Sequence, residues 1–382
     1  MIYFDNAATT YPKPDKVKRA MFYALNNFGS NPGRGGHEMS YNTSEKIYET
    51  RKTAADFFGI DSPENIIFTK NCTESLNIVI KGLAKKGGHF ICSSLEHNAV
   101  ARPLEALKNY GICSYDIAPV ESDDLDTVKR FESLIRPNTI AIVCTGASNV
   151  FGKALPVKKL AAMAHSHGLL FVLDSAQTAG TVKIDCKNDG IDFLCTAGHK
   201  GLYGPMGTGI LAINCNEVLN TLYEGGTGSY SAVLTQPQKY PDRFESGTIN
   251  VPGIIALGES MKFVSSVGIQ NIYKSEKNHI ITIYRSLLNI PQIVFYSNPE
   301  SKTESFAPLL SFNIKGLHSE ETAGMLANDD IAVRAGLHCA PLAHEFYGTS
   351  DTGTVRIAPS IFTTEKDIKL LLISIGKIAK TV

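Results

Sequence analysis

Residues 139–174 read TIAIVCTGASNVFGKALPVKKLAAMAHSHGLLFVLD, and this stretch decides the fold. Thr139–Thr145 is a nearly continuous apolar run of strand length, and Leu169–Asp174 is a second one. Between them, Val157–His167 carries apolar residues at helical spacing and is followed by Gly168, which predicts a helix that ends there. Two strands that are apolar on both faces, joined by a helix, predict a parallel sheet covered on both sides.

The same alternation of strands and helices extends on both sides of this unit. Short runs rich in Ile, Phe and Val predict strands, and longer runs with apolar residues on one face predict helices. We expect further strands at Asn65–Thr69, His89–Ser93 and Ile191–Thr196, and further helices at Glu74–Leu83, Ala99–Asn109, Ile254–Val267 and Ile269–Leu288.

A long segment divides the chain into two predicted domains. Residues 225–250 are rich in Gly, Pro and polar residues, and a loop of this length in a compact protein is often functional. Beyond it the pattern changes to long helices followed by mixed helices and strands. We therefore expect an α/β protein with a large domain over 15–255 and a smaller α+β domain over 256–382, with 1–14 packed alongside the smaller one.

Composition excludes several classes of protein. The 382 residues carry 37 Lys+Arg and 37 Asp+Glu, so the net charge of +0 does not favour a nucleic-acid or anionic membrane partner. Eight cysteines are too sparse for a disulfide scaffold, and the absence of a C-x-x-C spacing argues against a zinc ribbon. No apolar run is long enough to span a bilayer, and no export signal is apparent. We expect a protein of the reducing cytoplasm.

Reactive side chains follow the predicted strands one after another. They are Thr73, His97, Asn149, Asp174 and Lys200. Taken singly, four of them have ordinary structural explanations: a helix cap (Thr73), a surface histidine (His97), a turn asparagine (Asn149) and a solvated lysine (Lys200). Only the Asp174 carboxylate, at the end of an apolar strand, favours a function by itself. Ligands of open α/β sheets bind beyond the carboxyl ends of the strands, so we expect the five side chains to share one site.

Together these residue types match the needs of pyridoxal 5'-phosphate. The start of the helix at Thr73 could bind the cofactor's phosphate, and the imidazole of His97 could lie against its aromatic ring. Lys200 can form a Schiff base with the aldehyde, and Asp174 can keep the ring nitrogen protonated. The sequence therefore predicts an enzyme that uses this cofactor.

Several motifs resemble the class V aminotransferase family of pyridoxal-phosphate enzymes, and most of all its cysteine desulfurases, in the group II branch shared with selenocysteine lyases. The resemblance runs nearly end to end. It is carried by Tyr3–Thr10 (YFDNAATT), Glu96-His97, Ser148–Gly152 (SNVFG), Asp174–Gln177 (DSAQ), Gly198–Lys200 (GHK), Phe244–Thr248 (FESGT), Arg334–Cys339 (RAGLHC) and Thr354–Arg356 (TVR). It implies fold type I of the pyridoxal-phosphate transferases, a homodimer, and conversion of L-cysteine to L-alanine with the sulfur held as a persulfide.

The resemblance also implies a role for each site residue. Lys200, Cys339 and His97 would be catalytic, with Cys339 as the nucleophile and His97 stacked on the ring. Asn149 and Arg356 would bind the substrate's carboxylate, and Arg334 would also bind the substrate. The cofactor would be held by Lys200, Asp174, Gln177, His97, Thr73, Cys72, His199, Thr196 and, from the other subunit, Thr248.

Two departures from the family pattern leave alternatives open. Ala197 stands where a Ser or Thr usually contacts the phosphate, so either Thr196 replaces that contact or the contact is lost. Gly225–Ser229 also differs from the expected pattern. A selenocysteine lyase or another pyridoxal-phosphate C–S lyase or aminotransferase is therefore the main alternative. A sulfur-acceptor protein is expected as a further partner.

Three other readings are weaker. Gly204–Gly209 resembles a dinucleotide loop but lacks the strand-to-helix context of one. His338, Cys339 and His344 lie close in sequence, yet no fourth metal ligand accompanies them. A thiol-rich carrier of sulfur or metal is the third reading, and Cys72, Cys144 and Cys195 are expected to pack beside strands.

Overall fold

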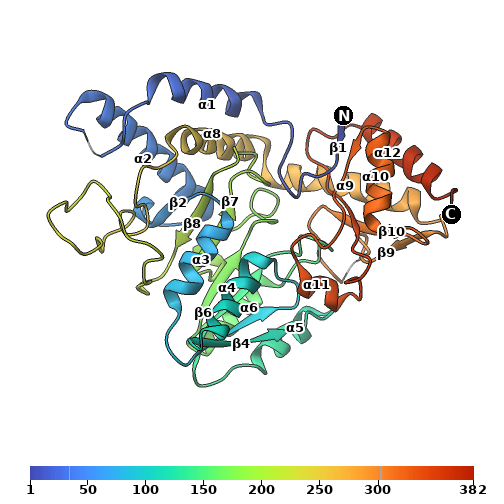
Figure 1. Ribbon diagram of the computed structural model, residues 1–382, viewed down its shortest axis with the longest axis horizontal. Helices are drawn as coiled ribbons and strands as arrows, with labels where there is room; N and C mark the ends of the chain where they lie inside the picture. Colours follow the sequence, from blue (N-terminus) through green and yellow to red (C-terminus); the bar gives the residue numbers. More distant parts are fainter. Residues whose placement is uncertain (34, 302) are drawn as a thin grey trace.

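A seven-stranded sheet forms the centre of the larger domain in the computed structural model, which describes residues 1–33, 35–301 and 303–382 (Figure 1). Strands β3 to β7 pair in parallel, and β8 pairs antiparallel with its two neighbours. The sheet is therefore mostly parallel, as the apolar strands predicted. Across it the strands are β2 (Ile66–Thr69), β8 (Gly209–Ile213), β7 (Phe193–Ala197), β6 (Leu170–Asp174), β5 (Thr139–Thr145), β3 (Gly88–Ser93) and β4 (Cys113–Ala118).

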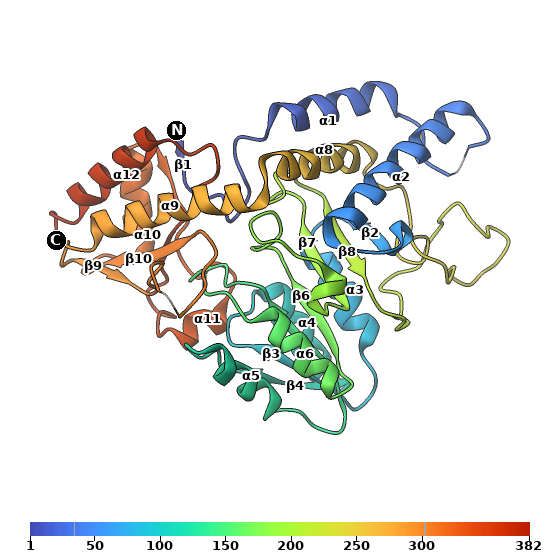
Figure 2. The same cartoon turned by 180° about the vertical axis from the view of Figure 1, so that it is seen from behind.

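Helices cover both faces of this sheet because its strands are apolar on both faces. Along β6, Phe171 and Leu173 pack into one core and Val172 packs into the other. One face is covered by α3 (Cys72–Leu83) and α4 (Asn98–Asn109), and the other by α6 (Val157–Ser166) and α8 (Val251–Val267), as Figures 1 and 2 show from opposite sides. The remaining helices of this domain are α1 (Asp15–Asn27), α2 (Glu38–Phe58), α5 (Asp124–Glu132), α7 (Cys186–Asp189) and the 3₁₀ turn Pro63–Asn65.

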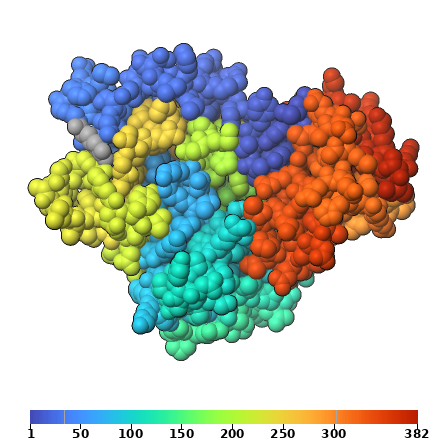
Figure 3. Space-filling view, in the orientation of Figure 1, coloured from blue at the N-terminus to red at the C-terminus, as the bar shows by residue number. Residues whose placement is uncertain are grey.

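The smaller domain is built on a three-stranded antiparallel sheet. Its order is β12 (Val355–Ile357), β10 (Leu310–Ile314), β9 (Ile293–Phe295). Strand β1 (Ile2–Tyr3) pairs in parallel with β11 (Ile331–Ala332), and the buried Phe4 joins the core of this domain. Its helices are α9 (Ile269–Leu287), α10 (Ser319–Asn328), α11 (Pro341–Phe346) and α12 (Glu365–Ile378). Figure 3 shows the dark blue N-terminal residues lying between the two domains.

The structure adds elements that the sequence patterns did not identify, among them β4, β8, α1, α2 and α5. Position 255 falls inside α8, whose Ile254, Ile255 and Leu257 are buried in the core of the larger domain. Gly268, with φ of 90°, separates α8 from α9. We therefore propose Gly268 as the junction of the two domains.

Candidate active site

The reactive side chains meet in one cavity at the carboxyl ends of the parallel strands. His97 follows β3, Asn149 follows β5, Asp174 ends β6 and Lys200 follows β7. The cavity has a volume of about 80 Å³, and Thr73, Gln177 and His199 also line it. Neighbouring parallel strands present their carboxyl ends at the same edge, which is why residues 100 positions apart can meet here.

Asp174 is held so that one carboxylate oxygen faces the cavity. The side chain is buried, and its Oδ1 accepts hydrogen bonds from the Cys72 thiol (3.3 Å) and from the Ala176 N–H (2.9 Å). Burial, helped by the nearby Asp174 charge, raises the pKa of Cys72 well above its ordinary value, so this thiol keeps its proton and donates it. The other Asp174 oxygen accepts no hydrogen bond from the described residues and is available to a protonated ring nitrogen.

Lys200 is half-buried, and its amine has no hydrogen-bond partner among the described residues. Within the described ranges its Nζ makes no hydrogen bond and no ion pair. Burial lowers its pKa, while the Asp174 carboxylate acts in the opposite direction. A lysine whose pKa is lowered exposes more of its neutral, nucleophilic form, which Schiff-base chemistry requires.

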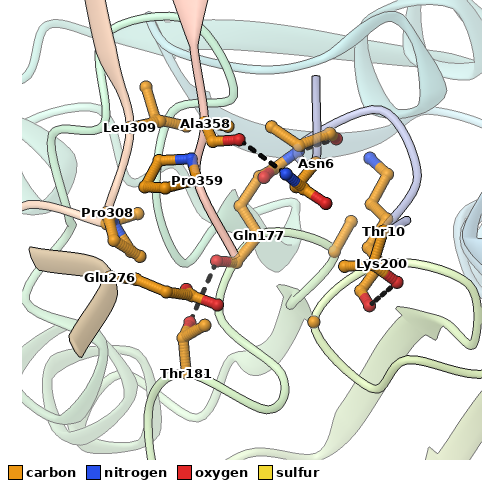
Figure 4. Close-up of a pocket in the computed structure, with 14 residues that line it drawn as sticks. Asn6, Thr10, Gln177, Thr181, Lys200, Glu276, Pro308, Leu309, Ala358 and Pro359 are labelled. Atoms are coloured by element: carbon orange, nitrogen blue, oxygen red, sulfur yellow. Dashed lines mark hydrogen bonds between the residues drawn. The ribbon is translucent and has the colours of Figure 1, made fainter. Parts of the chain in front are cut away.

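Two glycines allow the loop of Gln177 to lie against the loop of Lys200. A Cβ on Gly180, whose φ is 88°, would lie 2.0 Å from the carbonyl oxygen of Gly201. A Cβ on Gly201 would lie 2.3 Å from the carbonyl oxygen of Ala179. Only glycine permits this backbone contact. Gln177 and Lys200 both line a second, smaller cavity (Figure 4).

One end of the main cavity has the donors that a phosphate needs. It is bounded by Asn71, Cys72 and Thr73 at the start of α3, where the backbone N–H groups of Cys72 and Thr73 have no acceptor in the described residues. Helix N-termini bind phosphates through such groups. The buried Nδ1 of His199 also has no partner there. These unpartnered groups fit pyridoxal 5'-phosphate.

Two other residues expected at the phosphate lie outside this cavity. Ala197 lines it, so Thr196, the preceding residue of β7, points to the opposite face of the sheet. The hydroxyl of Thr196 is buried and has no partner in the described part of the chain. Thr248 is exposed, and its Oγ1 accepts a hydrogen bond from Asn31 (3.2 Å). A single chain does not bring Thr248 to Lys200.

His97 is held as a neutral ring at the start of α4. Its Nδ1 accepts a hydrogen bond from the Ala99 N–H (3.0 Å), so the ring proton sits on Nε2. Burial lowers the pKa of His97 to about 4. A neutral, oriented ring at the cavity wall suits stacking on an aromatic cofactor.

Arg356 lies beside Asn149, at one end of the site. Only 1% of this residue is exposed, and its Nη1 donates to the Asn149 carbonyl (2.8 Å) while its Nη2 donates to Asp5 Oδ1 (2.8 Å). Its Nε has no partner in the described residues. The Asn149 side chain donates to the His338 carbonyl (2.9 Å), which ties this end to the segment that carries Cys339.

Cys339 lies on a strained turn beside this end. His338 and Cys339 have φ of 50° and 57°, a left-handed conformation that non-glycine residues adopt at a cost. The Cys339 carbonyl accepts from the Asn98 N–H (2.8 Å), next to His97. Arg334 Nη2 lies 3.7 Å from Cys339 Sγ and offers that sulfur a hydrogen-bond donor. Cys339 is the exposed member of the eight unpaired cysteines.

Sequence reasoning gave no role to two buried or half-buried carboxylates beside the site. Asp5 lies in the Tyr3–Thr10 motif, but nothing in that motif showed that it would contact Arg356. Glu96 is fully buried, and its Oε1 accepts from the Thr145 N–H (3.0 Å) and from the backbone and side chain of Ser93. Burial raises the pKa of Glu96 to about 8. An acidic residue directly before His97 was the available signal.

Neither a metal-binding cluster nor a membrane-spanning helix is found among the described residues. They hold no group of three or more His, Cys, Asp or Glu side chains arranged to bind a metal ion, and this includes His338, Cys339 and His344. None of their helices is long and apolar enough to cross a membrane.

Comparison with known proteins gives a consistent result. The family model "Aminotransferase class-V" matches residues 2–371. A probable cysteine desulfurase of Methanothermobacter thermautotrophicus is 32% identical over 99% of this chain and 94% of its own. The cysteine desulfurase of Cronobacter sakazakii is 30% identical over 99% of this chain and 93% of its own.

Solved structures agree with the sequence relatives. The apo structure of the cysteine desulfurase from Thermococcus onnurineus NA1 superposes with a TM-score of 0.91 at 29% identity, covering 100% of this chain and 95% of that one. The cysteine desulfurase CsdA from Escherichia coli gives 0.87 at 26% identity, with the same coverage. The fold is therefore the one that the resemblance implied.

Proposed function

Because the chain belongs to the class-V aminotransferase family, we propose that it is a cysteine desulfurase that uses pyridoxal 5'-phosphate. It would convert L-cysteine to L-alanine and retain the sulfur as a persulfide on Cys339. The observation that carries the proposal is one arrangement: the unpartnered amine of Lys200 and the carboxylate of Asp174 share a cavity with Asn149. Asn149 in turn hydrogen-bonds to the buried Arg356 and to the segment that carries the exposed Cys339 thiol.

The residues that line the cavity would hold the cofactor at its ends and on its ring. When bound, the cofactor supplies an aldehyde for amino groups and a ring that withdraws electrons. Asp174 would hold a proton on the ring nitrogen, and the start of α3 with His199 would bind the phosphate. The proposed cofactor-binding side chains are Lys200, Asp174, Gln177, His97, Thr73, Cys72 and His199.

Three residues would act directly on the substrate. Arg356 binds the α-carboxylate, and Lys200 takes the proton from Cα. The Cys339 thiolate then attacks the substrate sulfur, so that an S–S bond forms as the substrate's Cβ–S bond breaks. The electron pair of the broken bond stays with carbon, which takes up protons and leaves as L-alanine.

We propose a homodimer in which Thr248 of each chain reaches the phosphate site of its partner. This accounts for two observations: Thr248 is exposed and outside the cavity of its own chain, and Thr73 at the phosphate end is also exposed.

Because Cys339 is exposed, a sulfur-acceptor protein could remove the persulfide sulfur. All eight cysteines are unpaired, which favours a reducing compartment such as the cytoplasm.

Alanine and sulfide release from L-cysteine by the purified holoenzyme tests the proposal. Lys200→Ala should abolish the yellow absorbance and the activity. Cys339→Ser should keep the absorbance and lose sulfide release, whereas the matched control Cys215→Ser, at a half-buried thiol, should keep both. A colourless protein that gains no absorbance with added cofactor would contradict the proposal. Faster release of selenide from L-selenocysteine would indicate a selenocysteine lyase.

A further inference from the structure

The segment Asp5–Lys13, called the N-terminal strap below, crosses the active site from the smaller domain to the larger one. Before it, Phe4 is buried in the core of the smaller domain. After it, α1 packs against α8 of the larger domain. The strap therefore touches both halves of the site, and Figure 4 shows Asn6 and Thr10 near Gln177 and Lys200.

At the cofactor half, the strap is bonded to the two loops that carry cofactor-binding residues. The Ala7 carbonyl accepts from Gln177 Nε2 (3.1 Å). The carbonyl of His199, which precedes Lys200, accepts from the Thr10 N–H (3.0 Å) and from Lys13 Nζ (2.7 Å). These bonds fix the strap relative to the proposed cofactor site.

At the substrate half, the strap contacts Arg356 through Asp5. The carboxylate accepts from Arg356 Nη2 at 2.8 Å. The backbone around Asp5 is itself held, because the Ala358 N–H donates to the Phe4 carbonyl (2.7 Å) and Asn6 Nδ2 donates to the Ala358 carbonyl (2.9 Å). Asp5 therefore has little freedom to move away from the guanidinium.

The two bonds made by Arg356 define the plane of its guanidinium. Nη1 is held by the Asn149 carbonyl and Nη2 by Asp5, while Nε has no partner in the described residues. A carboxylate bound bidentately must lie in this plane, so its orientation decides where the substrate carboxylate sits. Burial lowers the pKa of Arg356, and the Asp5 charge opposes that effect.

We propose that Asp5 is a positioning residue for the substrate: it orients Arg356 so that the α-carboxylate binds in register with Lys200, to which the strap is bonded. This inference rests on the proposed function. Asp5 touches neither substrate nor cofactor and acts through Arg356.

The effect of losing Asp5 follows from this role. A hydrogen bond to a charged group contributes enough to change an equilibrium about 10- to 100-fold. We expect Asp5→Ala to raise the KM for L-cysteine in that range with kcat nearly unchanged. Asp5→Asn keeps an oxygen acceptor for Nη2, so its effect should be smaller, about threefold to tenfold.

The experiment compares the holoenzyme with Asp5→Ala and Asp5→Asn. Asp15→Asn is the matched control, because Asp15 is an exposed carboxylate ten residues along, paired with Lys18. Alanine release from L-cysteine gives kcat and KM. Separately, the change in cofactor absorbance gives the apparent Kd for L-alanine and for ethylamine, which has the amine but no carboxylate. Thermal unfolding of each variant shows whether it is folded.

The inference predicts that the Asp5 variants bind L-alanine more weakly and ethylamine as well as the parent does. An unchanged or lower KM, or an equal loss of affinity for both amines, would overturn it. If the parent enzyme releases no alanine from L-cysteine, the proposed function fails, and the two absorbance titrations still decide the role of Asp5.

Discussion

Replacing Glu245 with glutamine is expected to destabilise the protein strongly, because it leaves a buried guanidinium without its counter-charge. Arg51 and Glu245 form a bidentate ion pair, with Nη1–Oε1 and Nη2–Oε2 distances of 2.8 Å. Their side chains are 5% and 7% exposed. The Phe68 N–H also donates to Oε1 (2.7 Å), and the Phe68 ring lies under the guanidinium.

The magnitude follows from this burial. Removing one partner of a buried ion pair costs about 3–5 kcal/mol, whereas an exposed pair contributes about 0–1 kcal/mol. The total free energy of unfolding of a typical domain is only about 5–15 kcal/mol. Because both carboxylate oxygens accept from Arg51, Glu245→Gln also places an amide N–H₂ against a guanidinium donor in either orientation, so the loss should lie in the upper part of the range.

Urea unfolding followed by circular dichroism measures this loss. The matched control is Glu217→Gln, which removes a carboxylate from an exposed pair with Lys85 at 3.3 Å, and it should cost less than about 1 kcal/mol. Changing both Arg51 and Glu245 to methionine should recover much of the stability, because no buried charge remains. A cost for Glu245→Gln no larger than that of the control would refute the reasoning. Because Glu245 anchors the segment that leads to Thr248, cofactor affinity should fall as well.

Three further predictions concern groups around the site. The pKa of Glu96 is raised from 4.5 to about 8, so between these pH values the folded protein holds a proton that the unfolded chain has lost. The free energy of unfolding should therefore fall as pH rises, by up to about 1.4 kcal/mol per pH unit. Glu96→Gln should flatten this fall when urea midpoints at about pH 6 and about pH 9 are compared, and an unchanged slope would count against the prediction. Lys13→Ala removes the 2.7 Å bond to the His199 carbonyl and should weaken cofactor binding about tenfold in dialysis measured by absorbance, whereas equal retention would show that this bond is dispensable. Gly180→Ala forces a Cβ to 2.0 Å from the Gly201 carbonyl oxygen at a φ of 88°, so the variant should lose cofactor and about 3 kcal/mol of stability, and a stable yellow variant would contradict the close approach.

Local patterns were sufficient for the central part of the fold. The apolar runs at Thr139–Thr145 and Leu169–Asp174 predicted β5 and β6, and the helix between them ends at Ser166, one residue before the predicted end. The antiparallel β8 was not identified, because it directly follows the Gly-rich turn at Gly204–Gly209, whose pattern resembles a dinucleotide loop. Strand direction depends on pairing partners, which no short run of sequence encodes.

The chemistry of the site was also visible in part. Lys200 and Asp174 could be expected together, because both follow strands of one sheet. The contact between Cys72 and Asp174 could not, because it depends on how α3 packs on the sheet. The alternation of side chains along β7 decides which face of the sheet Thr196 points to. Which of the two faces that is depends on how β7 pairs with its neighbouring strands, and the sequence alone did not give this pairing.

The sequence by itself determined a mostly parallel α/β sheet, the residue types of a pyridoxal-phosphate site and an isolated Cys339, because periodicity and side-chain chemistry are local properties. Only the tertiary structure decided that Asp5 meets Arg356 and that Lys13 meets His199. These pairs are 351 and 186 residues apart in the chain. Contacts over such separations arise from packing two domains and a strap together, and that packing depends on the whole hydrophobic core rather than on any motif.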